Sequence, residues 1–335
     1  MKPPLCFPFL FSLCTIGGAL AALGQVTPAT PRPFFTQPTP APGGAKPWPF
    51  STGAGAAAAT NAPPARDVPL VEKKLEELSN RDVSADGQKA LAINAAKWKH
   101  AETDNFILHY RRATEAQKVV REVEYDLWFV ATTLGAGKDR YAMKSHVFVF
   151  EDNDEWKQFL SVSSNPNKWA VSFAHGDDLY LNVRGSGNSG SGSFDSHTTA
   201  HETTHAVVAR LYPRARWPLW LNEGFAEYMG GASVAARKGQ SAKRYERDLQ
   251  KADMSLTTLE SLTSYPSGDD QVHALYQTSE KFVRFLMTEA PKDRIAKFVE
   301  TVLAGKGMKD GVLEIYGDKF KDWDAFMKRF ERFSK

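Results

Sequence analysis

Two neighbouring blocks within residues 196–231 decide the fold: HETTH at 201–205 and WLNEGFAEY at 220–228. An α-helix turns once per 3.6 residues, so His201 and His205, four positions apart, project from one face. Pro218 suits the first turn of a second helix, in which Glu223 and Glu227 also share a face. The spacing therefore predicts two helices with imidazoles on one and carboxylates on the other, joined by a turn over 210–218.

The residues of these blocks are those of a zinc site. Two imidazoles on one helix face can share a tetrahedral Zn²⁺. Glu202 is too close in sequence to complete the coordination easily, but its carboxylate is suited to take the proton of a zinc-bound water. The second helix supplies Glu223 as third ligand, because glycines at 224 and 231 are expected to let it approach the first helix closely. We predict one Zn²⁺ per chain, bound by His201, His205 and Glu223.

The alternative is a solvated helix that carries a histidine pair by chance. A random His-Glu-x-x-His occurs in roughly one chain in a hundred of this length and composition. Such a helix would not predict a Trp-Leu-Asn-Glu-Gly run one helix later, so the second block favours the metal site.

HETTH followed by WLNEGFAEY resembles the gluzincin metallopeptidases, the thermolysin-like and M1 aminopeptidase-like group. The separation of His205 from Glu223 is one position shorter than in the M1 pattern, a difference that an altered loop between the helices accommodates. The resemblance covers roughly residues 106–286. It implies an α+β, thermolysin-like zincin domain, in which a small mixed sheet with an edge hairpin is followed by a helical C-terminal half.

The resemblance also implies supporting and catalytic residues around the zinc ligands. Glu227 resembles the carboxylate that orients a ligand histidine in thermolysin-like enzymes, and Asn222 is assigned to the same supporting layer. Tyr276 is the candidate donor to the tetrahedral intermediate, as a tyrosine is in M1-like enzymes. His273 is the second candidate, because thermolysin uses a histidine there. An ordinary salt bridge for Glu227 and a packing role for Tyr276 stay open.

These residues predict a secreted zinc-dependent peptidase that acts on peptides or proteins. The sequence has no segment that resembles Gly-x-Met-Glu-Asn, the M1 element whose glutamate holds the free amino terminus of the substrate. The resemblance therefore favours an endopeptidase over an aminopeptidase. The alternative is a non-catalytic, zinc-containing binding protein or cell-envelope scaffold. Glu202 favours the enzyme, because a purely structural site needs no base. The substrate and the oligomeric state are left open.

The composition is that of a globular protein and gives no sign of a nucleic-acid or membrane-surface partner. The chain has 335 residues, of which 42% are hydrophobic and 24% charged, enough for one sizeable catalytic domain with extensions. Its net charge of +3 comes from interspersed signs, so neither nucleic acid nor an anionic membrane is implied as a partner.

The N-terminal region has two distinct compositions. Residues 1–24 have the layout of a secretory signal peptide, with a retained membrane anchor as the alternative. Both cysteines lie in that segment, so a cleaved product has no disulfide. Residues 25–69 are rich in Pro, Ala and Gly and are predicted to be a disordered linker. We expect an exported protein, periplasmic or extracellular and without stable membrane insertion, whose metallopeptidase domain spans 70–335.

Periodicity predicts the remaining elements. Residues 70–104 are expected to form a helical prelude, with helices at 70–78 and 88–99 that turn Leu75 inward. Alternating residues predict a half-buried strand at 106–111, in which His109 is a strand residue and not a ligand. A hairpin is expected from strands at 169–174 and 179–183, one of them the substrate-binding edge. Further expected elements are a strand at 146–150 and helices at 114–134, 153–160, 271–289, 291–303, 309–316 and 319–333.

Overall fold

The computed structural model describes residues 63–64, 67–165, 167, 170–184, 195–240 and 254–333. The expected signal peptide and most of the expected linker lie outside the described residues, so both stay predictions, as does export. Within the described part of the chain, no helix is both long and apolar enough to cross a membrane.

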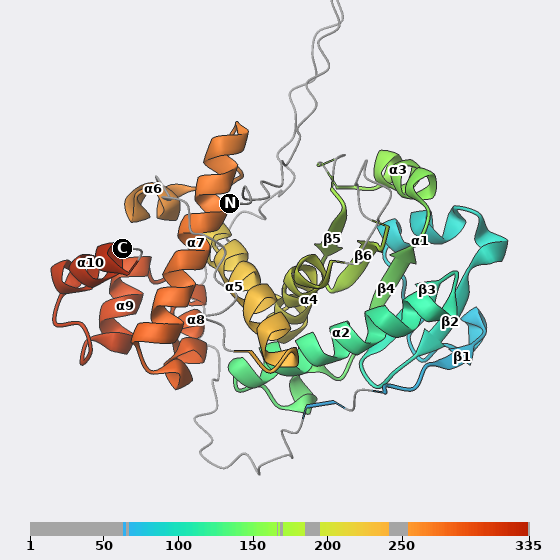
Figure 1. The fold of residues 1–335 in the computed structure, drawn as a ribbon, viewed down its shortest axis with the longest axis horizontal. Helices are drawn as coiled ribbons and strands as arrows, with labels where there is room; N and C mark the ends of the chain where they lie inside the picture. The colour runs from blue at the N-terminus through green and yellow to red at the C-terminus, as the bar shows by residue number, and fades with distance from the viewer. Residues whose placement is uncertain are drawn as a thin grey trace, which may run out of the picture. The chain divides into compact units, whose positions relative to one another are not determined.

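The described residues contain a mixed six-stranded sheet with the strand order β1-β2-β3-β4-β6-β5 (Figure 1). Strands β3, β4 and β6 are parallel to one another, and the other pairs are antiparallel. The predicted hairpin is formed by β5 and β6, which leaves β5 at the edge of the sheet. The strands are β1 (Val71–Lys73), β2 (Lys99–Glu102), β3 (Phe106–Tyr110), β4 (Ser145–Phe150), β5 (Ser172–His175) and β6 (Asp178–Asn182).

Helices cover both faces of the central strands. Leu108 and Val149 belong to a core that includes residues of α2 (Ala113–Thr133) and α4 (Ser196–Leu211). Phe148 and Tyr180 face the other way, into an aromatic core with residues of α1 (Ala85–Ala92) and α3 (Asn153–Val162). Every residue of β3 is therefore buried, so the prediction of a half-buried strand was wrong. The alternation of side chains along β3 arises because the two faces of the strand pack into different parts of the protein interior, and not because one face is exposed to solvent.

The helical prelude expected over 70–104 is also incorrect in part. Residues 71–73 form β1 and residues 99–102 form β2, and both strands pair within the sheet. Helical structure is limited to α1 and two short 3₁₀ turns, Leu75–Glu77 and Ala95–Lys97. Leu75 is 42% exposed instead of facing inward. Sheet pairing with distant residues overrides local helical patterning here.

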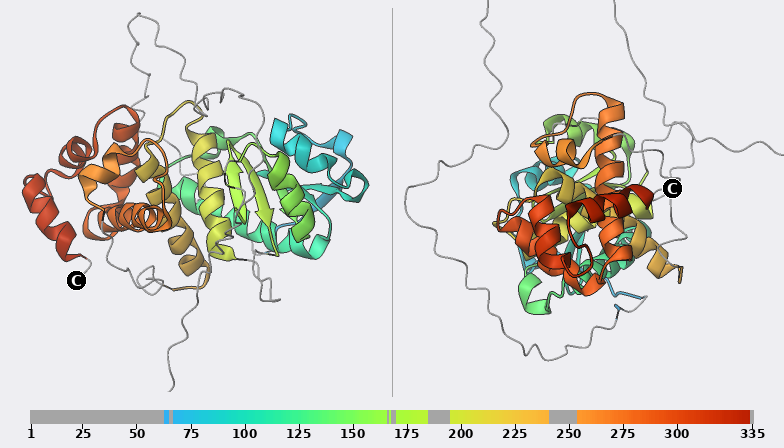
Figure 2. Two further views of the ribbon diagram at one scale, coloured as in Figure 1. Left: turned by 90° about the horizontal axis from the view of Figure 1, so that it is seen from above. Right: turned by 90° about the vertical axis from the view of Figure 1, so that its left-hand side faces the viewer.

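The described residues after the sheet, 195–240 and 254–333, are largely helical, as predicted. Helix α5 (Leu219–Arg237) packs on α4 along one side and on α7 (Asp269–Glu289) along another. Figure 2 shows the C-terminal helices gathered on the side of α5 that lies away from the sheet. The remaining helices are α6 (Leu256–Ser261), α8 (Ile295–Leu303), α9 (Met308–Tyr316) and α10 (Trp323–Arg332).

Glycines let α5 approach both neighbouring helices, but not at the predicted positions. A Cβ on Gly224 would lie 2.4 Å from the Ser279 carbonyl oxygen, so this glycine serves the contact with α7. A Cβ on Gly231 would meet nothing within 4 Å. Gly230 instead faces α4, where a Cβ would lie 3.3 Å from the His201 amide nitrogen. The close approach to the histidine helix therefore depends on Gly230.

Candidate metal centre

Helix α4 is held near both of its ends. Asp195 caps the first turn by accepting a hydrogen bond from the His197 amide at 3.1 Å. Near the other end, the buried Arg210 donates to the backbone carbonyls of Asn105, Tyr141 and Met143. The Arg210 contacts therefore tie the end of α4 to the segments that precede β3 and β4.

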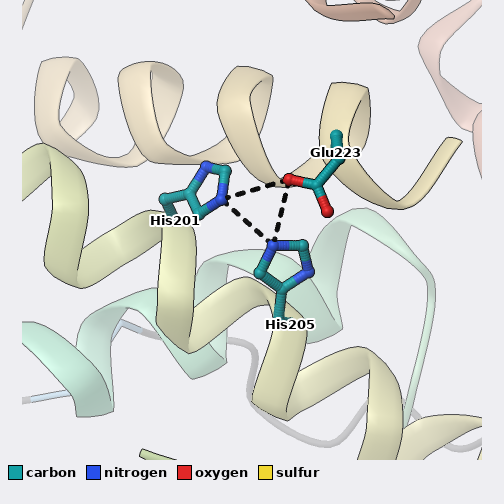
Figure 3. Close-up of side chains that lie close together, drawn as sticks. All are labelled: His201, His205 and Glu223. Atoms are coloured by element: carbon teal, nitrogen blue, oxygen red, sulfur yellow. Dashed lines mark hydrogen bonds and ion pairs between the residues drawn. The ribbon is translucent and has the colours of Figure 1, made fainter. Parts of the chain in front are cut away.

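His201, His205 and Glu223 point toward one another across the α4–α5 interface (Figure 3). The two histidine Nε2 atoms lie 3.0 Å apart. Each of them lies 3.6 Å from Glu223 Oε2. Within the described ranges, this is the group of histidine and carboxylate side chains whose ligand atoms are close enough to hold a metal ion.

The geometry and the donor set of this group fit a zinc ion. Tetrahedral ligands at the usual zinc distances are separated by about 3.3 Å, which lies between the observed separations. Glu223 is buried, and its Oε2 has no hydrogen-bond partner among the described residues although it faces both imidazoles. A buried carboxylate oxygen that accepts no hydrogen bond is costly unless a cation lies beside it. Three protein ligands also leave a fourth position open, as in catalytic zinc sites.

The charges of the group are strongly coupled. Burial alone would lower the pKa of His201, but its ion pair with Glu223 and the charges of Glu227 and Glu202 raise that pKa to about 9. Burial would raise the pKa of Glu223, but His205 and His201 hold it well below its ordinary value. A divalent cation bound here must displace the His201 proton, so binding is expected to weaken in acid.

Glu202 lies between the metal-ligand helix and the edge of the sheet. Its Oε2 accepts a hydrogen bond from the Ala174 amide of β5 at 3.0 Å. Burial raises the pKa of this carboxyl, while His201 and His205 act in the opposite direction. A raised carboxyl pKa brings the group closer to the range in which a general base is effective.

Both predicted supporting residues lie beside the ligands. Asn222 Oδ1 accepts a hydrogen bond from His205 Nδ1 at 3.2 Å when that nitrogen carries the proton. Glu227 Oε1 is 3.6 Å from His201 Nδ1. A polar partner on the nitrogen that faces away from the metal holds an imidazole in one orientation.

The candidates on α7 differ in their positions. The Tyr276 ring centre is 6.2 Å from that of His201, which brings this tyrosine to the site. Burial and the charge of Glu223 raise the pKa of Tyr276, so its hydroxyl stays protonated and able to donate. His273 is exposed and forms no side-chain hydrogen bond or ion pair with another described residue. The structure therefore brings Tyr276, and not His273, into contact with the group.

Two further residues at the site were missed in the sequence. The Tyr265 hydroxyl donates to Glu223 Oε1 at 2.8 Å. His197 Nε2 lies 3.3 Å from Glu227 Oε2. His197 precedes His201 by one helical turn, so the spacing of the motif carried a signal for it. Tyr265 lies between α6 and α7, where no periodic pattern indicates its position.

Comparison with protein families agrees with this arrangement. A family model described as the Peptidase MA superfamily matches residues 144–330, more than half of the chain. The chain belongs to the Peptidase MA superfamily. The matched region runs from the start of β4 to α10 and includes both helices of the site. No curated protein matches the chain.

Proposed function

We propose that this protein is a zinc-dependent peptidase of the gluzincin type, with Glu202 as general base. The observation that carries the proposal is the convergence of His201 and His205 on Glu223 Oε2, a buried oxygen that accepts no hydrogen bond from the described residues. Membership of a peptidase superfamily supports the reaction class. The adjacent Glu202 distinguishes the site from a structural metal site, which needs no base.

The residues divide the reaction between them. His201, His205 and Glu223 would hold a zinc ion, which would supply Lewis acidity at the scissile carbonyl and the attacking water. Glu202 accepts the proton of the attacking water and passes it to the departing amine. Tyr276 donates a hydrogen bond to the oxyanion that develops as the carbonyl becomes tetrahedral.

The position of Glu202 also supports a substrate orientation. Because Glu202 is bonded to the Ala174 amide, the base lies directly beside the edge strand β5. An extended peptide can add to an exposed edge through main-chain hydrogen bonds. We propose that substrate pairs with β5, which places an internal peptide bond next to the base. This arrangement favours endopeptidase over aminopeptidase activity.

The Glu202→Gln variant tests the general base. The substitution preserves size but removes the basic oxygen, so we expect peptidase activity to fall by about 100-fold or more while bound zinc is retained. Hydrolysis of a fluorogenic peptide library measures the first effect, and elemental analysis of purified protein measures the second. Glu331→Gln, an exposed change on α10, is the matched control. Wild-type turnover in Glu202→Gln would remove this residue from the mechanism.

The Glu223→Ala variant tests the metal centre itself. We expect the wild type to bind about one zinc ion per chain. The variant lacks the third ligand, so we expect it to lose most of this zinc. His201→Ala should give the same loss. Equal zinc affinity in wild type and Glu223→Ala would contradict the assignment of this ligand.

A further inference from the structure

His197, His201 and His205 follow one another at four-residue intervals and share one face of α4. Glu223 and Glu227 are spaced in the same way on α5. Glu223 meets His201 and His205, whereas Glu227 meets His197 and His201 one turn further along. Glu227 thus contacts two histidines, of which only His201 belongs to the metal group.

The two oxygens of Glu227 are used separately. Oε1 lies 3.6 Å from His201 Nδ1, and Oε2 lies 3.3 Å from His197 Nε2. The side chain of His197 is only 13% exposed and that of Glu227 is 21% exposed. Such limited exposure makes the pair less screened than a surface ion pair, so it can hold the carboxylate in one orientation.

The packing of α5 makes room for His197. A Cβ on Gly230 would lie 3.4 Å from His197 Nε2 and 3.2 Å from the His197 carbonyl oxygen. The distance to the carbonyl oxygen is tight, and the distance to the ring nitrogen leaves no spare room, so a larger residue at position 230 would separate the helices or displace the histidine ring. The absence of a side chain at this position allows His197 to reach Glu227.

We propose that His197 is a positioning residue of the metal centre, which acts through Glu227 on His201. This inference rests on the proposed zinc site. His197 fixes the Glu227 carboxylate, and the carboxylate in turn fixes the His201 ring with Nε2 directed at Glu223. Loss of a partner behind a metal ligand typically weakens metal binding by about 10- to 100-fold. His197 is two contacts away from the ligand nitrogen, so its loss is expected near the lower end of that range.

Zinc affinity of the full chain, measured by competition with a chromophoric chelator, tests the proposal without reference to activity. We expect His197→Ala to weaken zinc binding by about 10-fold. His197→Gln retains a side-chain amide donor and should recover most of the loss. In a Glu227→Ala background, His197→Ala should have no further effect, because the intermediary is already absent.

Adjacent glycines provide a second test that removes no polar side chain. Gly230→Ala should weaken zinc binding several-fold, because its Cβ meets His197. Gly231→Ala adds the same methyl group to the same helix, where nothing lies within 4 Å, and should leave affinity unchanged. Circular dichroism and the melting temperature show that each variant is folded.

The outcomes separate this inference from the proposed function. If the wild type does not bind zinc, both fail. If the wild type binds one zinc ion and His197→Ala binds equally well, the metal centre stands and the role of His197 is overturned. An equal loss from His197→Ala with and without Glu227 would also overturn it, because the effect would not pass through the carboxylate. If Gly230→Ala retains wild-type affinity, the packing argument for His197 fails.

Discussion

Tyr265 and Tyr276 lie next to each other at the metal centre but make different contacts. Tyr265 donates its hydroxyl proton to Glu223 Oε1, the oxygen that does not face the histidines. Because this hydrogen bond uses Oε1, Glu223 Oε2 stays directed at His201 and His205. Tyr276 lies against the His201 ring instead, with its own ring centre 6.3 Å from that of Tyr265. Tyr265 therefore orients the Glu223 carboxylate, whereas Tyr276 lies where the proposed function needs its hydroxyl.

Tyr276→Phe is expected to lower kcat by about 100-fold with little change in KM. The reason is that a donor to the developing oxyanion acts only in the transition state. Steady-state kinetics on one peptide, with zinc content checked, measures the effect. His273→Ala should leave kcat unchanged, because this exposed side chain makes no polar contact with another described residue. Normal kcat in Tyr276→Phe would leave Tyr276 a packing role alone.

Tyr265→Phe is expected to act on the metal and not mainly on turnover. Removing its hydroxyl leaves the buried Glu223 Oε1 with only the 3.4 Å contact from Asn222, so the carboxylate loses orientation. We expect zinc affinity to fall by about 10-fold, while kcat at saturating zinc changes little. Chelator competition and kinetics at two zinc concentrations separate these quantities. A loss of kcat that excess zinc does not restore would assign Tyr265 to catalysis.

At the scale of elements, α5 is the centre of the packing. It contacts α4 through Gly230 and α7 through Gly224, and it carries Glu223 between them. Trp220 adds an edge-on contact with Phe282 of α7, with ring centres 5.2 Å apart. The position of the third ligand therefore depends on two helix interfaces and not on one.

Gly224→Ala is expected to destabilise the protein by about 1–3 kcal/mol, as overpacking of a tight contact does. Its Cβ would lie 2.4 Å from the Ser279 carbonyl oxygen, so the backbone of α7 must move. Gly231→Ala has open space and should stabilise the helix by about 0.5–1 kcal/mol. Urea unfolding of both variants measures the difference. Equal free energies of unfolding would contradict the close α5–α7 contact.

Local periodicity was enough to predict the helices that carry the site. The four-residue spacings within HETTH and NEGFAE place their side chains on helix faces without any tertiary information. Strands β1 and β2 were missed because each is short and is specified by its pairing partner. The glycine contacts could not be assigned either, since which neighbour a helix face meets depends on the path of α7.

At the scale of the whole molecule, the sheet contains a chain of three histidines on strands β2, β3 and β4. His109 Nδ1 is 2.8 Å from His100 Nδ1, and His109 Nε2 is 2.9 Å from His146 Nδ1. His109 also stacks on Phe148, with ring centres 4.6 Å apart. Through Phe148 the three histidines adjoin the aromatic core that packs α1 and α3 on the sheet.

The histidine chain makes stability depend on pH. Burial lowers the pKa of all three side chains, most strongly at His109, where His146 and His100 add to the effect. The negative charge of Glu76 opposes the lowering of the His100 pKa. At His146 the lowering is opposed by the charges of Asp177, Asp82 and Glu102. The unfolded chain therefore binds more protons than the folded chain below the ordinary histidine pKa of 6.5.

The stability contributed by these three histidines is accordingly expected to be present above their ordinary pKa of about 6.5 and to be lost as the pH is lowered from there toward 5. Each histidine that is kept neutral contributes a slope of up to about 1.4 kcal/mol per pH unit. His109→Gln retains hydrogen-bonding groups but cannot titrate, so its free energy of unfolding should decline less steeply over this range. Urea unfolding at several pH values measures the slope, and His273→Gln on the surface of α7 is the control. Any loss of zinc in acid affects the wild type, His109→Gln and His273→Gln alike. The difference in slope between these proteins therefore reports on the histidines of the sheet. Parallel slopes for wild type and His109→Gln would show that acid acts elsewhere in the molecule.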